Sequence, residues 1–202
     1  MEQAGLRDDF PAVIIDRPFC TGQIPFVATE NTAAARAVAE RAYALGHRRV
    51  AILNAPEGDR SLRERFEGFR EVFGSEIDEI AIPNEVAAAK AAIPRLLGAR
   101  RRKERASLLV ALSEPLAIGA IAGVRDLGLN FSEQLSFIAF DDFPLAGHWT
   151  PRITVVRQDV ARLVKETVRL LLARIKAPGR PVENVRVAAS LEWRESVLPF
   201  SG

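Results

Sequence analysis

The sequence predicts an α/β fold. Short apolar, β-prone runs alternate along the chain with longer segments of helical periodicity, and strands separated by helices form right-handed crossovers and parallel sheets. The chain has 202 residues, of which 48% are apolar and 27% charged. Its mean hydropathy of +0.03 is typical of a folded protein. A chain of this length can build the core of one large domain or of two small ones.

The predicted strands are β-prone or continuously apolar runs bounded by proline, glycine or polar residues. They lie at residues 12–16, 25–28, 50–53, 80–82, 108–112, 135–140 and 153–156, with a last one near 185–193. The run at 108–112 is apolar throughout, as a strand covered on both faces requires.

The predicted helices lie at residues 31–45, 61–73, 85–97, 115–127 and 160–176. Thr29 or Asn31 is expected to cap the first helix and Ser61 the second, while Pro94 should kink or break the third. Three helices are followed by glycines suited to C-terminal caps, Gly46, Gly74 and Gly128. The longest helix carries an apolar stripe that is expected to face the core. Its members are Val160, Leu163, Val164, Val168, Leu171 and Ile175.

Composition excludes several classes of protein. No run approaches the ~20 apolar residues of a membrane span, and the first residues lack the order of a signal peptide, so the cytoplasm is the expected compartment. Cys20 cannot form an internal disulfide, and with His47 and His148 it gives no zinc-ligand spacing. Neither a metal nor a cofactor is expected.

The net charge of +2 is local in origin. The run at residues 100–105 contributes five basic side chains and one acidic one, or +4, so the rest of the chain sums to −2. A short charged connector is expected to be a solvated loop. Phosphate binding is the alternative.

The common enzyme motifs are missing: there is no Gly-x-Gly-x-x-Gly, phosphate loop or Gly-x-Ser-x-Gly turn. His47, at a helix end where a cation suits the dipole, is expected to be structural, and Cys20 an inert thiol. Asp141 and Asp142 follow a predicted strand, at the edge where open parallel sheets bind ligands. Adjacent residues on an extended chain point to opposite sides, so one ligand-facing carboxylate is expected.

Eight short segments resemble the effector-binding core of the LacI/GalR (lactose-repressor/galactose-repressor) family of bacterial transcription regulators. They are residues 10–17 (FPAVIIDR), 27–31 (VATEN), 44–52 (ALGHRRVAI), 65–69 (RFEGF), 117–120 (AIGA), 135–142 (LSFIAFDD), 151–158 (PRITVVRQ) and 191–196 (LEWRES). Each segment alone is a weak pattern. Eight in the family's order are hard to obtain by chance.

The resemblance implies a periplasmic-binding-protein-like fold, with two parallel-sheet subdomains joined by crossover strands. Residues 1–55 and 157–177 would be the remnant of an incomplete N-terminal subdomain, and residues 56–156 and 178–202 would form the C-terminal subdomain. The expected ligand is a small polar effector, a sugar or sugar derivative, bound in the cleft between them. Its binding would favour one orientation of the subdomains and pass that bias to DNA-binding heads.

The resemblance also implies which residues bind the effector. They are Arg65, Asp141, Ser61, Glu30, Asn31, Ser113, Glu114, Trp149 and Gln158. Arg65 matches the arginine of the family's Arg-x-x-Gly-aromatic element, and Asp141 matches the acid of its Gly-aromatic-Asp motif. Ser113 and Glu114 replace the family's usual Asn-Asp pair, and the glycine and second threonine of two further motifs are Ala139 and Val155. The contacts to a sugar are therefore expected to differ.

Three of these residues keep a structural alternative. Arg65 could form a surface pair with Glu64 or Glu67. Ser61 could serve only as a helix cap. Trp149 could stack on a sugar ring or plug an edge of the core.

The partners follow from the same resemblance. A complete member begins with a helix-turn-helix head, a hinge helix and roughly two or three βα units before the strand at residue 12. Without them, this polypeptide is not expected to bind operator DNA by itself. It is expected to be a homodimer, and either an excised fragment or a chain whose sheet edge at residues 12–28 a partner covers.

The sequence is also compatible with three other functions. One is a transporter's periplasmic-type sugar-binding protein, and another is an enzyme built on the same sheet. The third is weak, salt-dependent binding of nucleic acid by the arginine run.

Overall fold

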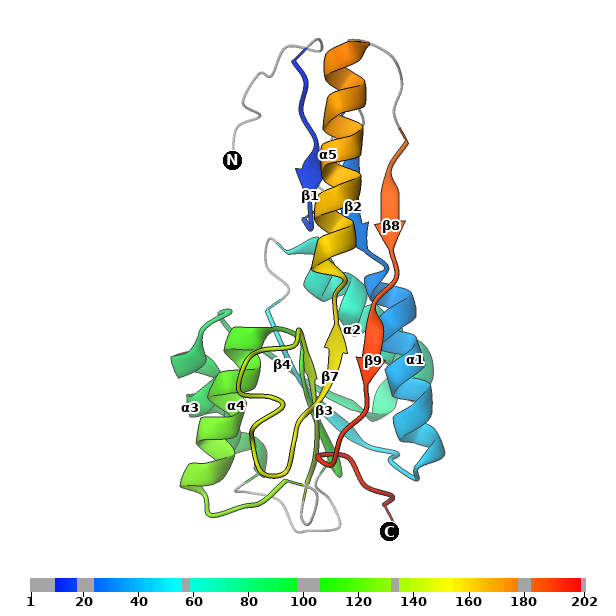
Figure 1. Ribbon diagram of the computed structural model, residues 1–202. Coiled ribbons are helices and arrows are strands. Elements are labelled where there is room, and N and C mark those ends of the chain that lie inside the picture. Colours follow the sequence, from blue (N-terminus) through cyan, green and yellow to red (C-terminus); the bar gives the residue numbers. More distant parts are fainter. Residues whose placement is uncertain are drawn as a thin grey trace. The chain divides into compact units, whose positions relative to one another are not determined.

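Helices and strands alternate along the chain, and the predicted α/β fold class is confirmed (Figure 1). The computed structural model describes residues 10–17, 24–55, 59–97, 106–131, 135–177 and 183–200. The chain divides into two compact units. The first comprises Met1–Glu30 and Asp159–Ala188, and the second Asn31–Gln158 and Ala189–Gly202.

The first unit is a small parallel sheet with one helix. Its strands, in the order β1-β2-β8, are β1 (Ile14–Ile15), β2 (Phe26–Thr29) and β8 (Val185–Val187). Helix α5 (Val160–Lys176) packs against all three strands. Four buried side chains form the core, namely Val27, Leu163, Leu170 and Val187.

The apolar stripe of helix α5 was predicted to face the core, and this prediction is wrong for most of its residues. Leu163 is buried as expected, but Val160, Val164, Val168 and Ile175 are between 49% and 64% exposed. Three short strands contact only one side of the helix, whereas its apolar residues extend over a wider arc.

The second unit is a six-stranded sheet in the order β4-β3-β5-β6-β7-β9. Its strands are β3 (Val50–Asn54), β4 (Ile77–Ala81), β5 (Leu108–Ala111), β6 (Ser136–Phe140), β7 (Thr154–Arg157) and β9 (Ser190–Glu192). All neighbours are parallel except β7 and β9, which are antiparallel. Strands β3, β5 and β6 are buried along their whole length, because helices cover both faces of the sheet (Figure 1).

Two pairs of helices cover those faces. They are α1 (Asn31–Ala44) with α2 (Arg60–Phe73), and α3 (Val86–Leu97) with α4 (Glu114–Asp126). A 3₁₀ turn, η1 (Gly74–Glu76), follows α2. A β-carbon at Gly68 would lie 2.4 Å from the carbonyl oxygen of Thr32. Glycine therefore allows α2 to approach α1 closely.

Several boundaries differ from the prediction. Strand β4 begins at Ile77, and α3 continues through Pro94, held by buried Ile93 and Leu97 on either side. The last predicted strand divides into β8 and β9, because the chain passes there from one sheet to the other. The cap of α2 is Asp59, so the prediction that Ser61 caps this helix is wrong.

The boundary between the units also differs from the predicted one. The first unit ends at Glu30 rather than at residue 55, since α1 packs on α2 and β3 pairs within the six-stranded sheet. In the other direction, the first unit extends to Ala188 and includes β8.

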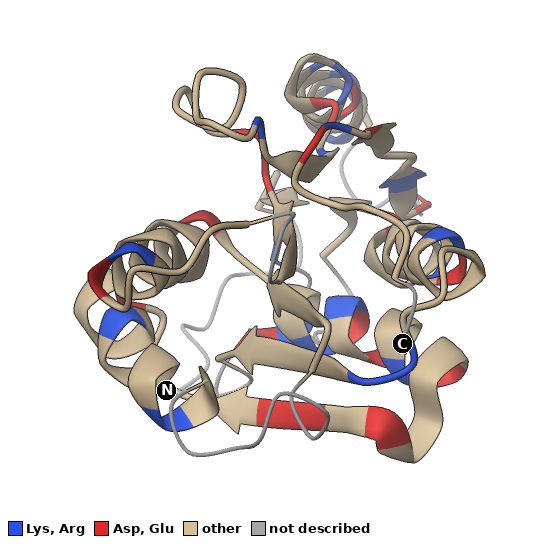
Figure 2. Cartoon of the chain, turned by 90° about the horizontal axis from the view of Figure 1, so that it is seen from below, with Lys and Arg blue, Asp and Glu red and all other residues tan. Residues whose placement is uncertain are grey.

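Charged residues lie mainly on the helices and loops (Figure 2). The central strands β3, β5 and β6 carry none, whereas the edge strand β4 carries Asp78 and Glu79, a common protection of an open edge. The basic run at 100–105 and Cys20 lie outside the described residues. No helix in the described part of the chain is long and apolar enough to cross a membrane.

Candidate functional site

Four strands of the second unit bring polar residues to one edge of its sheet. Strands β3, β5, β6 and β7 are parallel neighbours, so their carboxyl ends meet at the edge where open α/β sheets bind ligands. Asn54 ends β3, Ser113 follows β5, Asp141 follows β6 and Gln158 follows β7. All but Asn54 were predicted to bind the effector.

Arg65 is the centre of a buried hydrogen-bond network at this edge. Helix α2 holds it on its buried face, and the residue is only 3% exposed. Its Nε donates to Oδ1 of Asn31 at 2.9 Å, and its Nη1 donates to the carbonyl oxygen of Leu112 at 2.8 Å. Nη1 also lies 3.2 Å from Oδ2 of Asp141, and the guanidinium lies over the ring of Phe140. We call these residues, together with Gln158, the Arg65 cluster.

The partners of Arg65 differ from the surface pair that was the structural alternative. A buried guanidinium is stable only when charges and acceptors surround it, and the cluster supplies them. The surface pair with Glu64 or Glu67 is therefore not formed by Arg65. Glu64 instead accepts from Nε of Arg60 at 3.1 Å and from Nδ2 of Asn31 at 3.4 Å, and Glu67 accepts from Arg70.

Asp141 is held in one position from several sides. Its Oδ1 accepts from Nε2 of Gln158 at 2.6 Å, and its backbone N–H donates to Val156. Its φ of 70° lies in the left-handed region, which costs energy for a residue with a β-carbon and recurs at functional sites. Asp142 points elsewhere and pairs with Arg194 at 3.1 Å. Of the two carboxylates, Asp141 thus joins the cluster, whereas Asp142 pairs with Arg194.

Ser113 has a partner that the sequence did not indicate. Its hydroxyl donates to Oδ1 of Asn84 at 2.6 Å, and it makes no side-chain cap on α4. Asn84 follows Pro83 after the edge strand β4. That dipeptide signals a turn, and only the pairing order of the strands brings Asn84 to Ser113.

The remaining predicted residues have different surroundings. Ser61 is buried in the first turn of α2, and Glu114 is exposed in the first turn of α4. Trp149 is partly buried and packs against the core of the second unit, as expected if it fills an edge of that core. Glu30 is exposed and belongs to the first unit, where its N–H donates to Val187.

His47 has structural contacts, as predicted. Its Nδ1 lies 2.8 Å from Oγ of Ser107, and its Nε2 lies 3.1 Å from the carbonyl oxygen of Leu198. Burial lowers the pKa of His47 below its ordinary value of 6.5, against the raising effect of the hydrogen bond to Leu198. Through these two contacts, the imidazole joins the C-terminal segment to the body of the second unit.

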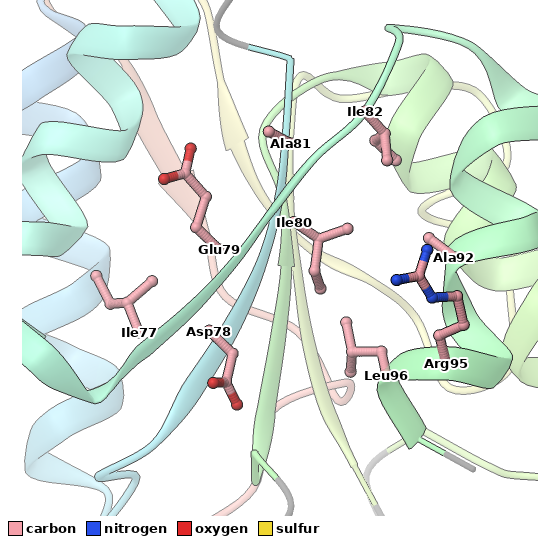
Figure 3. Close-up of a pocket in the computed structure, with 9 residues that line it drawn as sticks. All are labelled: Ile77, Asp78, Glu79, Ile80, Ala81, Ile82, Ala92, Arg95 and Leu96. Atoms are coloured by element: carbon pink, nitrogen blue, oxygen red, sulfur yellow. The ribbon is translucent and has the colours of Figure 1, made fainter. Parts of the chain in front are cut away.

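A pocket of about 520 Å³ lies elsewhere, along the edge strand β4 (Figure 3). Ile80 of β4 and Ile82, which follows this strand, lie on the side of Ala92 and Leu96 of α3, and Glu79 lies on the other side. No residue of the Arg65 cluster lines this pocket.

The Arg65 cluster has the chemistry of a site for hydroxyl groups. Asn31 and Gln158 offer amides, Asp141 offers an ionised acceptor, and Phe140 lies below the guanidinium. Such groups fix donors and acceptors in defined directions, as polyol recognition requires. Within the described residues, no three His, Cys, Asp or Glu side chains are grouped as a metal site would need.

Comparisons with known proteins agree with this fold. Residues 39–197 match the model of the periplasmic binding protein-like domain. A ribose operon repressor from Halalkalibacterium halodurans is 28% identical over 196 residues, which are 93% of this chain and 56% of that repressor. The chain spans about half the length of the curated relatives it matches.

Two solved structures illustrate the similarity. A LacI family transcriptional regulator from Enterococcus faecalis V583, with bound ribose, has a TM-score of 0.86 at 23% identity, over 95% of this chain and 70% of that one. A regulatory protein of the LacI family from Chloroflexus aggregans has a TM-score of 0.81 at 28% identity, over 93% of this chain and 68% of that one. The chain therefore belongs to the periplasmic binding protein-like domain family, in the form found in LacI-type transcriptional regulators.

Proposed function

We propose that the chain is the effector-binding domain of a LacI-type transcriptional regulator. In this proposal it binds a small polyhydroxylated ligand, a sugar, at the Arg65 cluster. The observation that carries the proposal is the network in which Arg65 is joined to Asp141, and Asp141 to Gln158, at the carboxyl edge of the six-stranded sheet.

The chemistry of the cluster suits sugar hydroxyls. A hydroxyl both donates and accepts, so it can donate to the carboxylate of Asp141 while it accepts from an amide of Gln158 or Asn31. The names of relatives support the same class of ligand. One curated relative is a ribose operon repressor, and two regulators of similar fold, from Enterococcus faecalis and Enterococcus faecium, hold ribose.

The relatives also favour regulation over the other functions left open by the sequence. They are transcriptional regulators rather than enzymes or transport proteins. We therefore propose a homodimer in the cytoplasm that acts on operator DNA through a separate helix-turn-helix segment. The effector needs only different affinities for two states of the regulator to change its affinity for DNA.

A thermal-shift screen tests the ligand class. Neutral monosaccharides, with D-ribose first, are compared with sugar phosphates, nucleosides and purines. A neutral sugar is expected to raise the melting temperature of the wild type, because a ligand that binds only the folded state stabilises it. The proposal fails if no sugar stabilises the protein while a purine or nucleoside does.

The variant Asp141→Asn tests the site itself. The amide of asparagine has only one acceptor oxygen, so it can accept from Arg65 or from Gln158 but not from both, and it carries no charge. A hydrogen bond to a charged group contributes about 1.5–3 kcal/mol. The dissociation constant of the sugar, measured by calorimetry, should therefore rise roughly 10- to 100-fold.

The neighbouring substitution Asp142→Asn is the matched control. It removes the same charge one residue away, from a carboxylate paired with Arg194, and should change the dissociation constant less than about twofold. Equal losses in the two variants would mean that the Arg65 cluster is not the binding site.

A further inference from the structure

We propose that the Arg65 cluster accepts an uncharged sugar and rejects its phosphorylated or carboxylated form, with Glu114 as a specificity-determining residue. This inference rests on the proposed function, because it narrows the class of ligand for the same site. It is carried by the distribution of charge around the cluster.

The buried cation of the site is already neutralised. Arg65 is 3% exposed, and its Nη1 lies 3.2 Å from Oδ2 of Asp141. Gln158 fixes the other oxygen of that carboxylate at 2.6 Å. A phosphate that approached this guanidinium would lie beside the carboxylate of Asp141, whose negative charge would repel it.

The other arginines near the cluster, on α2 and β7, do not supply a positive charge that could attract a phosphate in place of Arg65. Nε of Arg60 lies 3.1 Å from Oε1 of Glu64. Arg63 is exposed, two residues before Arg65, and side chains two apart on a helix do not share a face. Arg157, the last residue of β7, is exposed one residue before Gln158, and successive side chains of an extended chain point to opposite sides.

Helix N-termini at this edge would ordinarily attract an anion, but the chain's own carboxylates already lie there. Asp59 caps α2 by accepting from the N–H groups of Ser61 and Leu62. Glu64 lies 3.4 Å from Nδ2 of Asn31, the first residue of α1. Glu114 lies in the first turn of α4.

Glu114 is the carboxylate best placed to select the ligand. It follows Leu112, whose carbonyl oxygen accepts from Arg65, by only two residues. It is exposed, whereas Asp59 caps a helix and Asp141 pairs with Arg65. A neutral sugar meets hydroxyl, amide and carboxylate groups here, while a phosphate dianion meets carboxylates that repel it.

Calorimetric titrations of two matched pairs of probes test the inference. The pairs are D-ribose with D-ribose 5-phosphate and D-glucose with D-glucose 6-phosphate. In the wild type, the neutral member of the pair that binds should bind at least about tenfold more tightly than the phosphorylated member. In Glu114→Gln, the preference for the neutral sugar, given as the ratio of its affinity to that of the sugar phosphate, should fall about threefold or more.

The control is Asp126→Asn, which removes one negative charge from the opposite end of the same helix. It should leave both affinities unchanged. A sugar phosphate that binds as tightly as its neutral partner overturns the inference but leaves the proposed sugar site standing. The inference is also overturned, with the proposed sugar site left standing, if Glu114→Gln prefers the neutral sugar over its phosphate as strongly as the wild type does. If neither member of either pair binds, and no sugar stabilises the protein in the screen, the proposed function fails and the inference fails with it.

Discussion

Arg65 and Asp141 hold each other in the position that the site requires. Each is kept by a further partner, Asn31 for the arginine and Gln158 for the aspartate. Arg65 is buried, so removal of Asp141 would leave its charge without its ionic partner and would destabilise the second unit. The pair therefore ties the stability of the second unit to the geometry of its site.

His47 should make stability depend on pH. Its pKa is lowered by burial from the ordinary value of 6.5, so the unfolded chain binds more protons than the folded one. Its contribution is complete above the unfolded pKa and is lost as the pH falls through the lower folded value. The free energy of unfolding, measured with urea, should fall in the wild type as the pH decreases below the ordinary pKa of 6.5, and should fall less over the same range in His47→Gln.

Two comparisons make this prediction specific. The substitution His148→Gln, at the exposed histidine, should preserve the pH dependence. The carboxyl groups of Glu166 and Glu195, whose pKa values are lowered below 4.5 by hydrogen bonds from Arg169 and Arg152, contribute at more acidic pH. An unchanged slope in His47→Gln would assign the effect to another group.

At the scale of elements, close helix pairs cover the six-stranded sheet. A β-carbon at Gly68 would lie 2.4 Å from the carbonyl oxygen of Thr32 and 2.6 Å from the β-carbon of Ala35. The substitution Gly68→Ala should therefore separate α1 from α2 and lower the free energy of unfolding by about 1–3 kcal/mol. Chemical denaturation measures this loss.

Gly147→Ala is the control for this prediction. A β-carbon there would have no other atom within 4 Å, so the free energy of unfolding should change by less than about 0.5 kcal/mol. If Gly68→Ala proves as stable as Gly147→Ala, the two helices tolerate a wider separation than the packing indicates.

The elements show where sequence patterns succeed. The apolar runs of β3, β5 and β6 identified these strands, because burial on both faces leaves little choice of residue. The prediction that the whole apolar stripe of α5 is buried was wrong, because periodicity indicates which side of a helix is apolar but not how much of that side a sheet covers. The interruption expected at Pro94 did not occur, since packing overrode a local preference.

At the scale of the whole molecule, the order of motifs identified the family and most of the cluster. Arg65, Asp141, Asn31 and Gln158 were predicted, and the structure brings them together. Asn84 and the boundary after Glu30 were not predicted, because both depend on which sheet each strand joins. Local sequence does not encode that choice.

The central claim is that a neutral sugar binds at the Arg65 cluster. An NMR titration of the isotope-labelled protein with the sugar that stabilises it most tests this claim directly. The largest chemical-shift changes are predicted at the backbone amides of Asn31, Leu112, Asp141 and Gln158 and at the side-chain Nε–H of Arg65. Changes concentrated instead at the β4 pocket, around Ile80 and Leu96, would contradict it.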